Sequence, residues 1–191
     1  MTHTDLEKKY PVNEIFYSLQ GEGYHTGTPA IFVRFSGCNR HCEFCDTDHF
    51  SSTPMTVGEI LEKINAYPAR HIVITGGEPT LSIDEAVVER LKAAGYYLQI
   101  ETNGTNPVPA GIDWVTCSPK EGPWNIDRVD ELKIVYQNNP EMPEKLARIF
   151  KTDRLFLQPC SGENIPETVA FILDHPNWRL SLQTHKLISI Q

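Results

Sequence analysis

Three cysteines within a short stretch are the side chains in this sequence best suited to chemistry. Their spacing is Cys38-x3-Cys42-x2-Cys45. Thiolates held this close together can bind a soft metal ion or an iron–sulfur cluster. The chain has five cysteines, an odd number, and the other two, Cys117 and Cys160, lie far along the chain. This distribution does not favour a disulfide framework and indicates a metal site in a reducing compartment.

Two kinds of metal site fit the cysteine spacing. One is a closed structural zinc site, with His49 as the fourth ligand beside the three thiolates. The other is a four-iron cluster held by three thiolates, which leaves one iron open to bind another molecule and therefore suits catalysis. We favour the cluster, because zinc modules more often use paired knuckles in small domains. This chain is also large enough to fold without a metal.

A glycine-rich segment adds a second chemical signal. Gly76-Gly77-Glu78-Pro79 follows a short apolar run that predicts a strand. Two glycines allow the backbone to approach a neighbour closely, and a carboxylate can accept hydrogen bonds from an ammonium group. Without the cysteines, the simpler interpretation would be a turn between a strand and a helix.

Together, the two segments carry a resemblance to a known superfamily. The cysteine loop, with the aromatic Phe44 before its third cysteine, resembles the signature of the radical S-adenosylmethionine enzymes. Gly76-Gly77-Glu78-Pro79 resembles their motif for the methionine amino group. The resemblance implies that the amino and carboxylate groups of S-adenosylmethionine chelate the open iron.

Strands and helices are predicted to alternate along the chain. Thr56 and Glu59 form a capping-box pattern that begins one helix, Ser82 and Glu85 repeat it for a second, and a third helix is expected at 166–174. The predicted strands cover 12–18, 30–36, 71–75, 96–102, 113–118, 131–136, 154–158 and 179–183. This alternation predicts βαβ units in a mostly parallel sheet.

The polar segments follow the predicted strand ends, where parallel α/β sheets carry their sites. The chain has 191 residues, fewer than the roughly 250 of a full eightfold barrel. We therefore expect a single α/β domain, an incomplete, curved parallel β/α barrel of the radical S-adenosylmethionine type, over 1–191. A strand and turn at 12–23 would bind substrate, and the loop at 37–50 would hold the cluster.

Composition excludes several classes of protein. The chain carries 17 basic and 25 acidic residues, a formal charge of −8, which disfavours binding to nucleic acid or to anionic membranes. No stretch approaches the roughly 20 apolar residues of a membrane span, and the first nine residues are polar. We therefore expect a cytoplasmic protein with neither kind of partner.

Further segments resemble one family within the superfamily, the 7-carboxy-7-deazaguanine synthases, from about residue 12 to the end of the chain. They are 12–23 with Gln20-Gly21-Glu22-Gly23, Arg34, Cys45-Asp46-Thr47, Glu101-Thr102-Asn103-Gly104, Ser118-Pro119-Lys120, Gln158-Pro159 and Gln183-Thr184-His185-Lys186. The resemblance implies ring contraction of 6-carboxy-5,6,7,8-tetrahydropterin to 7-carboxy-7-deazaguanine, a precursor of queuosine and other 7-deazapurines, with release of ammonia. A 5′-deoxyadenosyl radical would abstract hydrogen from C6, and S-adenosylmethionine would be regenerated.

The resemblance also implies cofactors, partners and site residues. The cofactors are a [4Fe-4S] cluster, S-adenosylmethionine and Mg2+; the partners are an electron donor such as a flavodoxin or ferredoxin and a second copy in a homodimer. Cys38, Cys42 and Cys45 would hold the cluster, and Thr47 would bind Mg2+. Glu22, Glu101 and His185 would be catalytic.

The resemblance assigns the binding residues in two sets. Those for S-adenosylmethionine are Phe44, Cys45, Asp46, Gly77, Glu78, Ser118, Pro119, Lys120, Gln158, Pro159, Cys160 and Ser161. Those for substrate are Leu19, Gln20, Gly21, Glu22, Arg34, Thr75, His185 and Gln191; Gln191 stands where some family members end in proline.

Simple chemistry supports some of these roles and offers alternatives for others. The carboxylate of Glu22 can accept two N–H bonds from a pterin edge, or it can be a solvated turn residue. Arg34 lies in an apolar run and needs an anionic partner, which is either a substrate carboxylate or an acidic residue of the chain. Thr47 offers Mg2+ only a neutral hydroxyl, so substrate would supply the anionic ligand. Cys117 and Cys160 are expected to be small hydrophobic residues.

Two other functions share part of this evidence. A radical activase acting on a glycyl partner protein would use the same cysteine loop and Gly-Gly-Glu-Pro segment, but would not explain Gln20–Gly23 or Thr184–Lys186. A non-catalytic zinc module would bind zinc without inorganic sulfide and would unfold on chelation.

Overall fold

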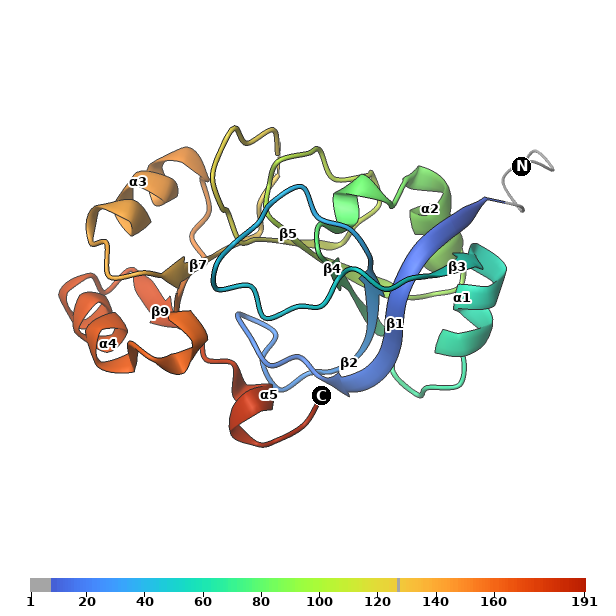
Figure 1. The fold of residues 1–191 in the computed structure, drawn as a ribbon, viewed down its shortest axis with the longest axis horizontal. Helices are drawn as coiled ribbons and strands as arrows, with labels where there is room; N and C mark the ends of the chain where they lie inside the picture. The colour runs from blue at the N-terminus through green and yellow to red at the C-terminus, as the bar shows by residue number, and fades with distance from the viewer. Residues whose placement is uncertain (1–7, 127) are drawn as a thin grey trace.

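The computed structural model describes residues 8–126 and 128–191, and these form one curved sheet with helices on its outer side (Figure 1). The strand order is β3-β1-β2-β4-β5-β6-β7-β8-β9. The strands are β1 Lys9–Leu19, β2 Pro29–Phe35, β3 Thr53–Thr56, β4 His71–Gly76, β5 Tyr97–Thr102, β6 Trp114–Cys117, β7 Glu131–Tyr136, β8 Leu155–Pro159 and β9 Trp178–Leu180.

The sheet has a parallel part and an antiparallel edge. From β2 through β9 all neighbouring strands pair in parallel, whereas β1 pairs antiparallel with both β2 and β3. The first and last strands in the order do not pair with each other, so the barrel stays open. The predicted incomplete, mostly parallel barrel is confirmed. The strand predicted at 12–18 is present as β1, which is longer and pairs antiparallel, and the short β3 was not predicted.

Helices α1 to α4 cover the outer face, and the short α5 lies near the C-terminus (Figure 1). They are α1 Val57–Ile64, α2 Glu85–Ala93, α3 Glu141–Ile149, α4 Ile165–Asp174 and α5 Thr184–Leu187. The capping box predicted for α1 is present, because Thr56 accepts from the Glu59 backbone and the Glu59 side chain accepts from Thr56. Helix α4 is confirmed, whereas α3 and α5 were not predicted.

The predicted start of α2 at Ser82 is wrong. Pro79–Leu81 forms a 3-10 turn, and the helix begins three residues after Ser82, at Glu85. Asp84 is the N-cap, and its side chain accepts from the backbone of Val87 at 3.1 Å. The predicted strand at 179–183 is also shorter than expected, because β9 ends at Leu180 and the chain then turns toward α5.

Apolar side chains fill the space between the sheet and the helices in two groups. One packs α1 and α2 against β1 to β6, and includes Ile60, Ile72 and Leu98, each fully buried. The other packs α3 and α4 against β7 to β9, and includes Leu157 and Phe171. This outer packing holds the parallel strands in register, so their carboxyl ends meet around a single opening.

The position of the α2 cap gives a stability prediction. Asp84→Ala removes the cap and its hydrogen bond from the Tyr10 hydroxyl, and should lower the free energy of unfolding by about 1–2 kcal/mol in urea titration. Ser82→Ala is the matched control and should change it by less than about 0.5 kcal/mol. A larger loss from Ser82→Ala than from Asp84→Ala would contradict the assigned helix start.

Candidate active site

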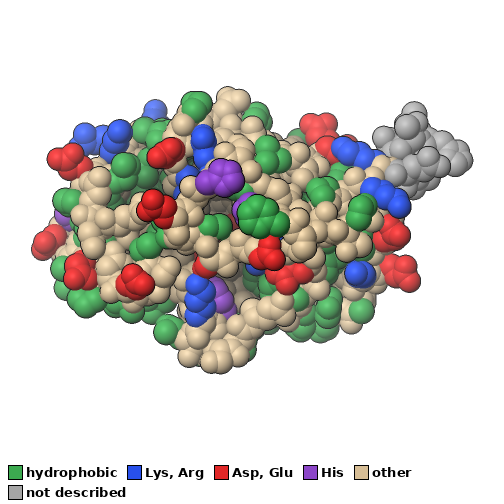
Figure 2. All heavy atoms as spheres, viewed as in Figure 1, with side chains coloured by type: hydrophobic (Ala, Val, Ile, Leu, Met, Phe, Trp, Pro, Cys, Tyr) green, Lys and Arg blue, Asp and Glu red, His purple; other side chains and the backbone are tan. Residues whose placement is uncertain are grey.

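Two adjoining cavities lie at the carboxyl ends of the parallel strands. The first, which we call the cysteine cavity, has a volume of about 200 Å3; the second, the hairpin cavity, has a volume of about 600 Å3 and is lined by β1, β2 and the turn between them. The face drawn in Figure 2 is hollowed near its centre, where charged and histidine side chains gather. Seven residues line both cavities and form the shared wall: Glu22, Asp46, Thr47, Thr75, Glu101, Lys133 and Gln183.

Most residues of the two predicted binding sets line different cavities, and Glu22, Asp46 and Thr75 line both. Cluster and S-adenosylmethionine candidates that line the cysteine cavity are Cys38, Cys42, Cys45, Phe44, Asp46, Gly77, Ser118, Lys120, Gln158, Pro159 and Ser161. The substrate candidates Leu19, Gln20, Gly21, Glu22, Arg34, Thr75, His185 and Gln191 all line the hairpin cavity. The lining does not include Glu78, Pro119 or Cys160.

The cysteine loop closes on itself and packs against the end of β4. The backbone N–H of Gly37 donates to His49 O at 2.9 Å, and that of Cys45 donates to Cys42 O at 3.1 Å. A Cβ at Gly77 would lie 2.3 Å from Gly37 O and 2.8 Å from Cys38 Cβ. Only glycine fits this contact, so the two sequence signatures meet directly at the cavity wall.

Three thiols at one cavity wall are a donor set suited to an iron–sulfur cluster. Cys38, Cys42 and Cys45 are all free and all line the cysteine cavity. Among the described residues, which include these three and His49, no three Cys, His, Asp or Glu side chains surround one ion position. A cluster of four irons needs thiolates spaced around a larger body, which is what a cavity wall provides. Burial raises the pKa of the Cys42 thiol, while the positive charge of Lys120 opposes that rise.

The side chain of Glu78 has a different role from the one its motif suggested. Its carboxylate is fully buried and accepts from Thr80 N at 3.1 Å, Thr102 Oγ1 at 2.7 Å and Asn103 N at 2.7 Å. These bonds tie the end of β4 to the end of β5. The carboxylate is therefore occupied by the chain itself, and within this motif Gly76 and Gly77 form the cavity wall.

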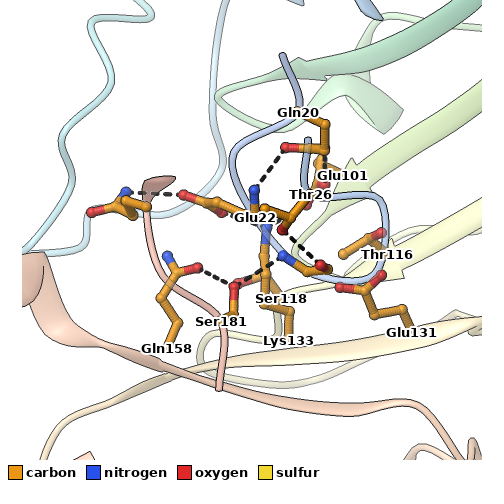
Figure 3. A network of polar contacts seen from close by, with 12 residues as sticks. Gln20, Glu22, Thr26, Glu101, Thr116, Ser118, Glu131, Lys133, Gln158 and Ser181 are labelled. Carbon is orange, nitrogen blue, oxygen red and sulfur yellow. Dashed lines mark hydrogen bonds and ion pairs between the residues drawn. The ribbon is translucent and has the colours of Figure 1, made fainter. Parts of the chain in front are cut away.

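A buried lysine joins two carboxylates in the shared wall (Figure 3). Lys133 Nζ on β7 lies 2.6 Å from Glu22 Oε2 in the turn after β1, and 2.8 Å from Glu101 Oε2 on β5. The Lys133 residue is only 5% exposed. Glu101 Oε1 also accepts from Gln20 at 3.2 Å and from Gln99 at 3.0 Å. Three elements distant in sequence are thus joined by one ammonium group.

Burial and charge act in opposite directions on these groups. For Glu22, burial alone would raise the carboxyl pKa, but Lys133 and Gln183 lower it below the ordinary value. For Glu101, burial and the charge of Glu22 outweigh Lys133, and the pKa is raised. Burial and Glu101 raise the pKa of the nearby Glu131 to about 7. The pKa of Lys133 is also raised, because its carboxylate neighbours outweigh its burial, so Lys133 stays charged.

Of the two partners considered for Arg34, the structure shows an acidic residue of the chain, Glu14. Its Nε donates to Glu14 Oε1 at 2.8 Å, and Gln191 Nε2 donates to Glu14 Oε2 at 2.9 Å. Arg34 lines the hairpin cavity, and within the described chain its two terminal nitrogens make no hydrogen bond. The ion pair with Glu14 therefore orients the guanidinium and leaves its fork free for an anion in the cavity.

The C-terminal segment covers the hairpin turn and reaches the cysteine loop. Thr184 N donates to Gly21 O at 2.9 Å, and Gly21 has no space for a side chain because His185 Nδ1 would lie 2.1 Å from its Cβ. Lys186 Nζ lies 2.5 Å from Asp46 Oδ2, directly after Cys45. Burial would raise the Asp46 pKa, but the hydrogen bond from Lys186 lowers it.

Sequence analysis missed three residues of this site. Lys133 is a charged residue between the apolar residues Leu132 and Ile134 of the predicted strand at 131–136, and this interruption was the available signal. Gln183, noted only as part of the C-terminal motif, donates to Glu22 at 3.0 Å and to Asp46 at 3.1 Å. Glu14 carried no signal, because its importance depends on the register that places it opposite Arg34.

Comparison with known proteins identifies the class of this site. The family model described as "Radical SAM superfamily" matches residues 32–172, most of the chain. The chain is an enzyme of this superfamily, which implies a [4Fe-4S] cluster and S-adenosylmethionine as cofactors. In the described residues, no helix has the length and apolar character needed to cross a membrane.

Relatives narrow the class to one family. The chain is 56% identical over 181 residues to the 7-carboxy-7-deazaguanine synthase of Bacteroides thetaiotaomicron, covering 94% of this chain and 98% of that one. It is 40% identical to the synthase of Haemophilus influenzae, covering 98% and 97%. The crystal structure of QueE from Escherichia coli matches with a TM-score of 0.78 and 34% identity, covering 93% and 95%. The chain belongs to the 7-carboxy-7-deazaguanine synthase family.

The contact between Gly77 and the cysteine loop gives a prediction. Gly77→Ala should push the loop backbone away, at a cost of about 1–3 kcal/mol, and the protein should retain severalfold less iron and sulfide after anaerobic reconstitution. Gly58→Ala is the matched control, because its nearest atom would lie 3.8 Å away and iron content should not change. Full iron and sulfide content in Gly77→Ala would contradict the proposed packing.

Proposed function

We propose that this protein converts 6-carboxy-5,6,7,8-tetrahydropterin to 7-carboxy-7-deazaguanine and releases ammonia. The observation that carries the proposal is the pair of cavities that share one wall. Three thiols line the smaller cavity, and a second, larger cavity beside it offers carboxylates and a free guanidinium fork. The shared wall would place a cofactor and a small heterocycle next to each other, which supports a reaction between them.

The chemistry of the hairpin cavity matches the two ends of this substrate. The aminopyrimidinone edge of a pterin presents N–H donors, and Glu22 can accept them because two of its four acceptor positions are used by Lys133 and Gln183. The substrate carboxylate would bind the terminal nitrogens of Arg34, which Glu14 already orients. His185, packed on Gly21, would contact the substrate from the C-terminal segment.

The cysteine cavity would hold the cofactors. Cys38, Cys42 and Cys45 would bind the cluster, and Gly77, Ser118 and Lys120 would contact S-adenosylmethionine. When bound, this pair would supply a 5′-deoxyadenosyl radical as the group that abstracts hydrogen from the substrate. Glu101 lies on the wall between this cavity and the hairpin cavity, where it would contact the reacting molecules from β5.

Thr47 is the proposed Mg2+ ligand. It lines both cavities and follows Asp46, whose carboxylate is engaged by Lys186. A single hydroxyl binds a hard cation weakly, so the substrate carboxylate and waters would complete the shell. Mg2+ would then bind together with substrate rather than before it. A homodimer and a flavodoxin or ferredoxin as reductant remain predictions.

The activity can be tested directly. The reconstituted protein, reduced without oxygen, should form 7-carboxy-7-deazaguanine and ammonia from the carboxytetrahydropterin, and omission of Mg2+ should lower the rate severalfold. Production of 5′-deoxyadenosine only when a glycyl partner protein is present would instead support an activase. Bound zinc without sulfide after reconstitution would support a structural module.

The Mg2+ assignment gives a separate prediction. Thr47→Ala should raise the Mg2+ concentration needed for half-maximal turnover by roughly tenfold or more, because a ligand of the cation is lost. The exposed Thr53→Ala on β3 is the matched control and should leave this concentration unchanged. Equal Mg2+ dependence of Thr47→Ala and the unmodified protein would remove Thr47 from the cation site.

A further inference from the structure

Lys133 occupies an unusual position for a charged side chain. It lies in the middle of β7, between buried Leu132 and Ile134, and its side chain is 6% exposed. It nevertheless lines both cavities, at the wall that separates them. A lysine with so little contact with water stays charged only because carboxylates surround it.

The two carboxylates depend on Lys133 as much as it depends on them. Glu22 and Glu101 are both half-buried around the same ammonium group, with side chains 17% and 16% exposed, and their charges repel each other. Without a cation between them, two buried carboxylates in one site share a proton, so one of them becomes neutral. Lys133 reduces this conflict, and its two short bonds also fix the orientation of both carboxylates.

The remaining contacts show what the fixed carboxylates can still accept. Each carboxylate has about four acceptor positions. Glu22 uses two, for Lys133 and Gln183. Glu101 uses three, for Lys133, Gln20 and Gln99. Positions are therefore left over on both, and because an ionised carboxylate only accepts hydrogen bonds, a further partner must be a donor.

We propose that Lys133 is a positioning residue that keeps Glu22 and Glu101 ionised and fixed, so that both accept N–H bonds from an amino-substituted heterocycle in the hairpin cavity. This inference rests on the proposed function and names the residue that makes its binding site an acceptor surface. Lys133 acts through the two carboxylates.

Removal of the positive charge should change the pH dependence of binding in a defined direction. Without Lys133, the carboxylates take up a proton at higher pH, and a protonated carboxyl offers the ligand a donor where an acceptor is needed. The low-pH loss of binding should therefore begin at higher pH. The charged and titratable groups that face the lysine are Glu22 in the turn, Glu101 on β5, Glu131 on β7, Lys120 after β6 and His185 on α5.

Binding of a ligand that does not turn over gives the cleanest measurement. The probe is 6-carboxypterin, which keeps the aminopyrimidinone edge and the carboxylate of the substrate. Its affinity for the reconstituted holoenzyme with S-adenosylmethionine is measured between pH 5.5 and 9. Lys133→Met should bind at least about tenfold more weakly at pH 7, with the acid limb moved up by about one pH unit or more.

Three companion variants separate charge from packing. Lys133→Arg keeps the charge and should keep the acid limb near that of the unmodified protein. Lys133→Met combined with Glu101→Gln removes the competing carboxylate and should move the limb back down. Lys92→Met, which breaks the 2.6 Å pair with Asp113 away from both cavities, should leave the limb unchanged. If Lys133→Met does not fold, Lys133→Gln, which is neutral but can still hydrogen bond, takes its place.

Different results of this experiment would contradict the role of Lys133 and the proposed function. An unmodified holoenzyme that fails to bind 6-carboxypterin contradicts the proposed function. An unmodified protein that binds it, together with neutral variants whose acid limb does not move, overturns the role of Lys133 and leaves the function standing. A limb that moves equally in Lys133→Arg and Lys133→Met also overturns it, because loss of packing would then be the cause.

Discussion

The site depends on one buried ion-pair group, in which the ammonium of Lys133 lies 2.6 Å from Glu22 and 2.8 Å from Glu101. Burying such charges is unfavourable unless each is paired and hydrogen bonded. The group therefore forms only when β7, β5 and the hairpin turn are all in place. Gln183 extends the same network to the C-terminal segment and to Asp46 of the cysteine loop. A single electrostatic requirement thus aligns β5, β7, the hairpin turn, the C-terminal segment and the cysteine loop.

Close packing at two glycines also positions the elements around the cavities. At Gly77 and Gly21 the backbone itself is the contact surface, because a side chain would overlap Gly37 in the first case and His185 in the second. Glu78 fixes the strand end beside Gly77 through its bonds to the end of β5. Glycine in these places removes volume, and the buried carboxylate prevents the freed backbone from moving. The cysteine loop is therefore held against the end of β4, and the hairpin turn is held against α5.

The parts of this structure set by local pattern could be predicted from the sequence. The alternation of strands and helices predicted a parallel sheet, and the short chain length predicted an open barrel. The pair Thr56 and Glu59 predicted the start of α1. Ser82 with Glu85 matched the same pattern, but Asp84 is the N-cap that accepts from Val87. The cavity-lining residues came largely from resemblance. Lys133 and Glu14 were not found, because their partners are brought to them only by strand register and sheet curvature.

The dependence of Glu22 and Glu101 on Lys133 explains why the wall between the cavities would contain three charges whose burial is unfavourable. An apolar residue at position 133 would avoid the desolvation of the ammonium, but it would leave two repelling carboxylates, of which one would be neutral. A wall of that kind presents a mixture of donors and acceptors to a ligand. With the lysine present, both carboxylates are acceptors of fixed direction before any ligand arrives. Charge compensation inside the strand therefore gives the adjoining cavity a single hydrogen-bonding character, and selection for a donor-rich heterocycle follows from it.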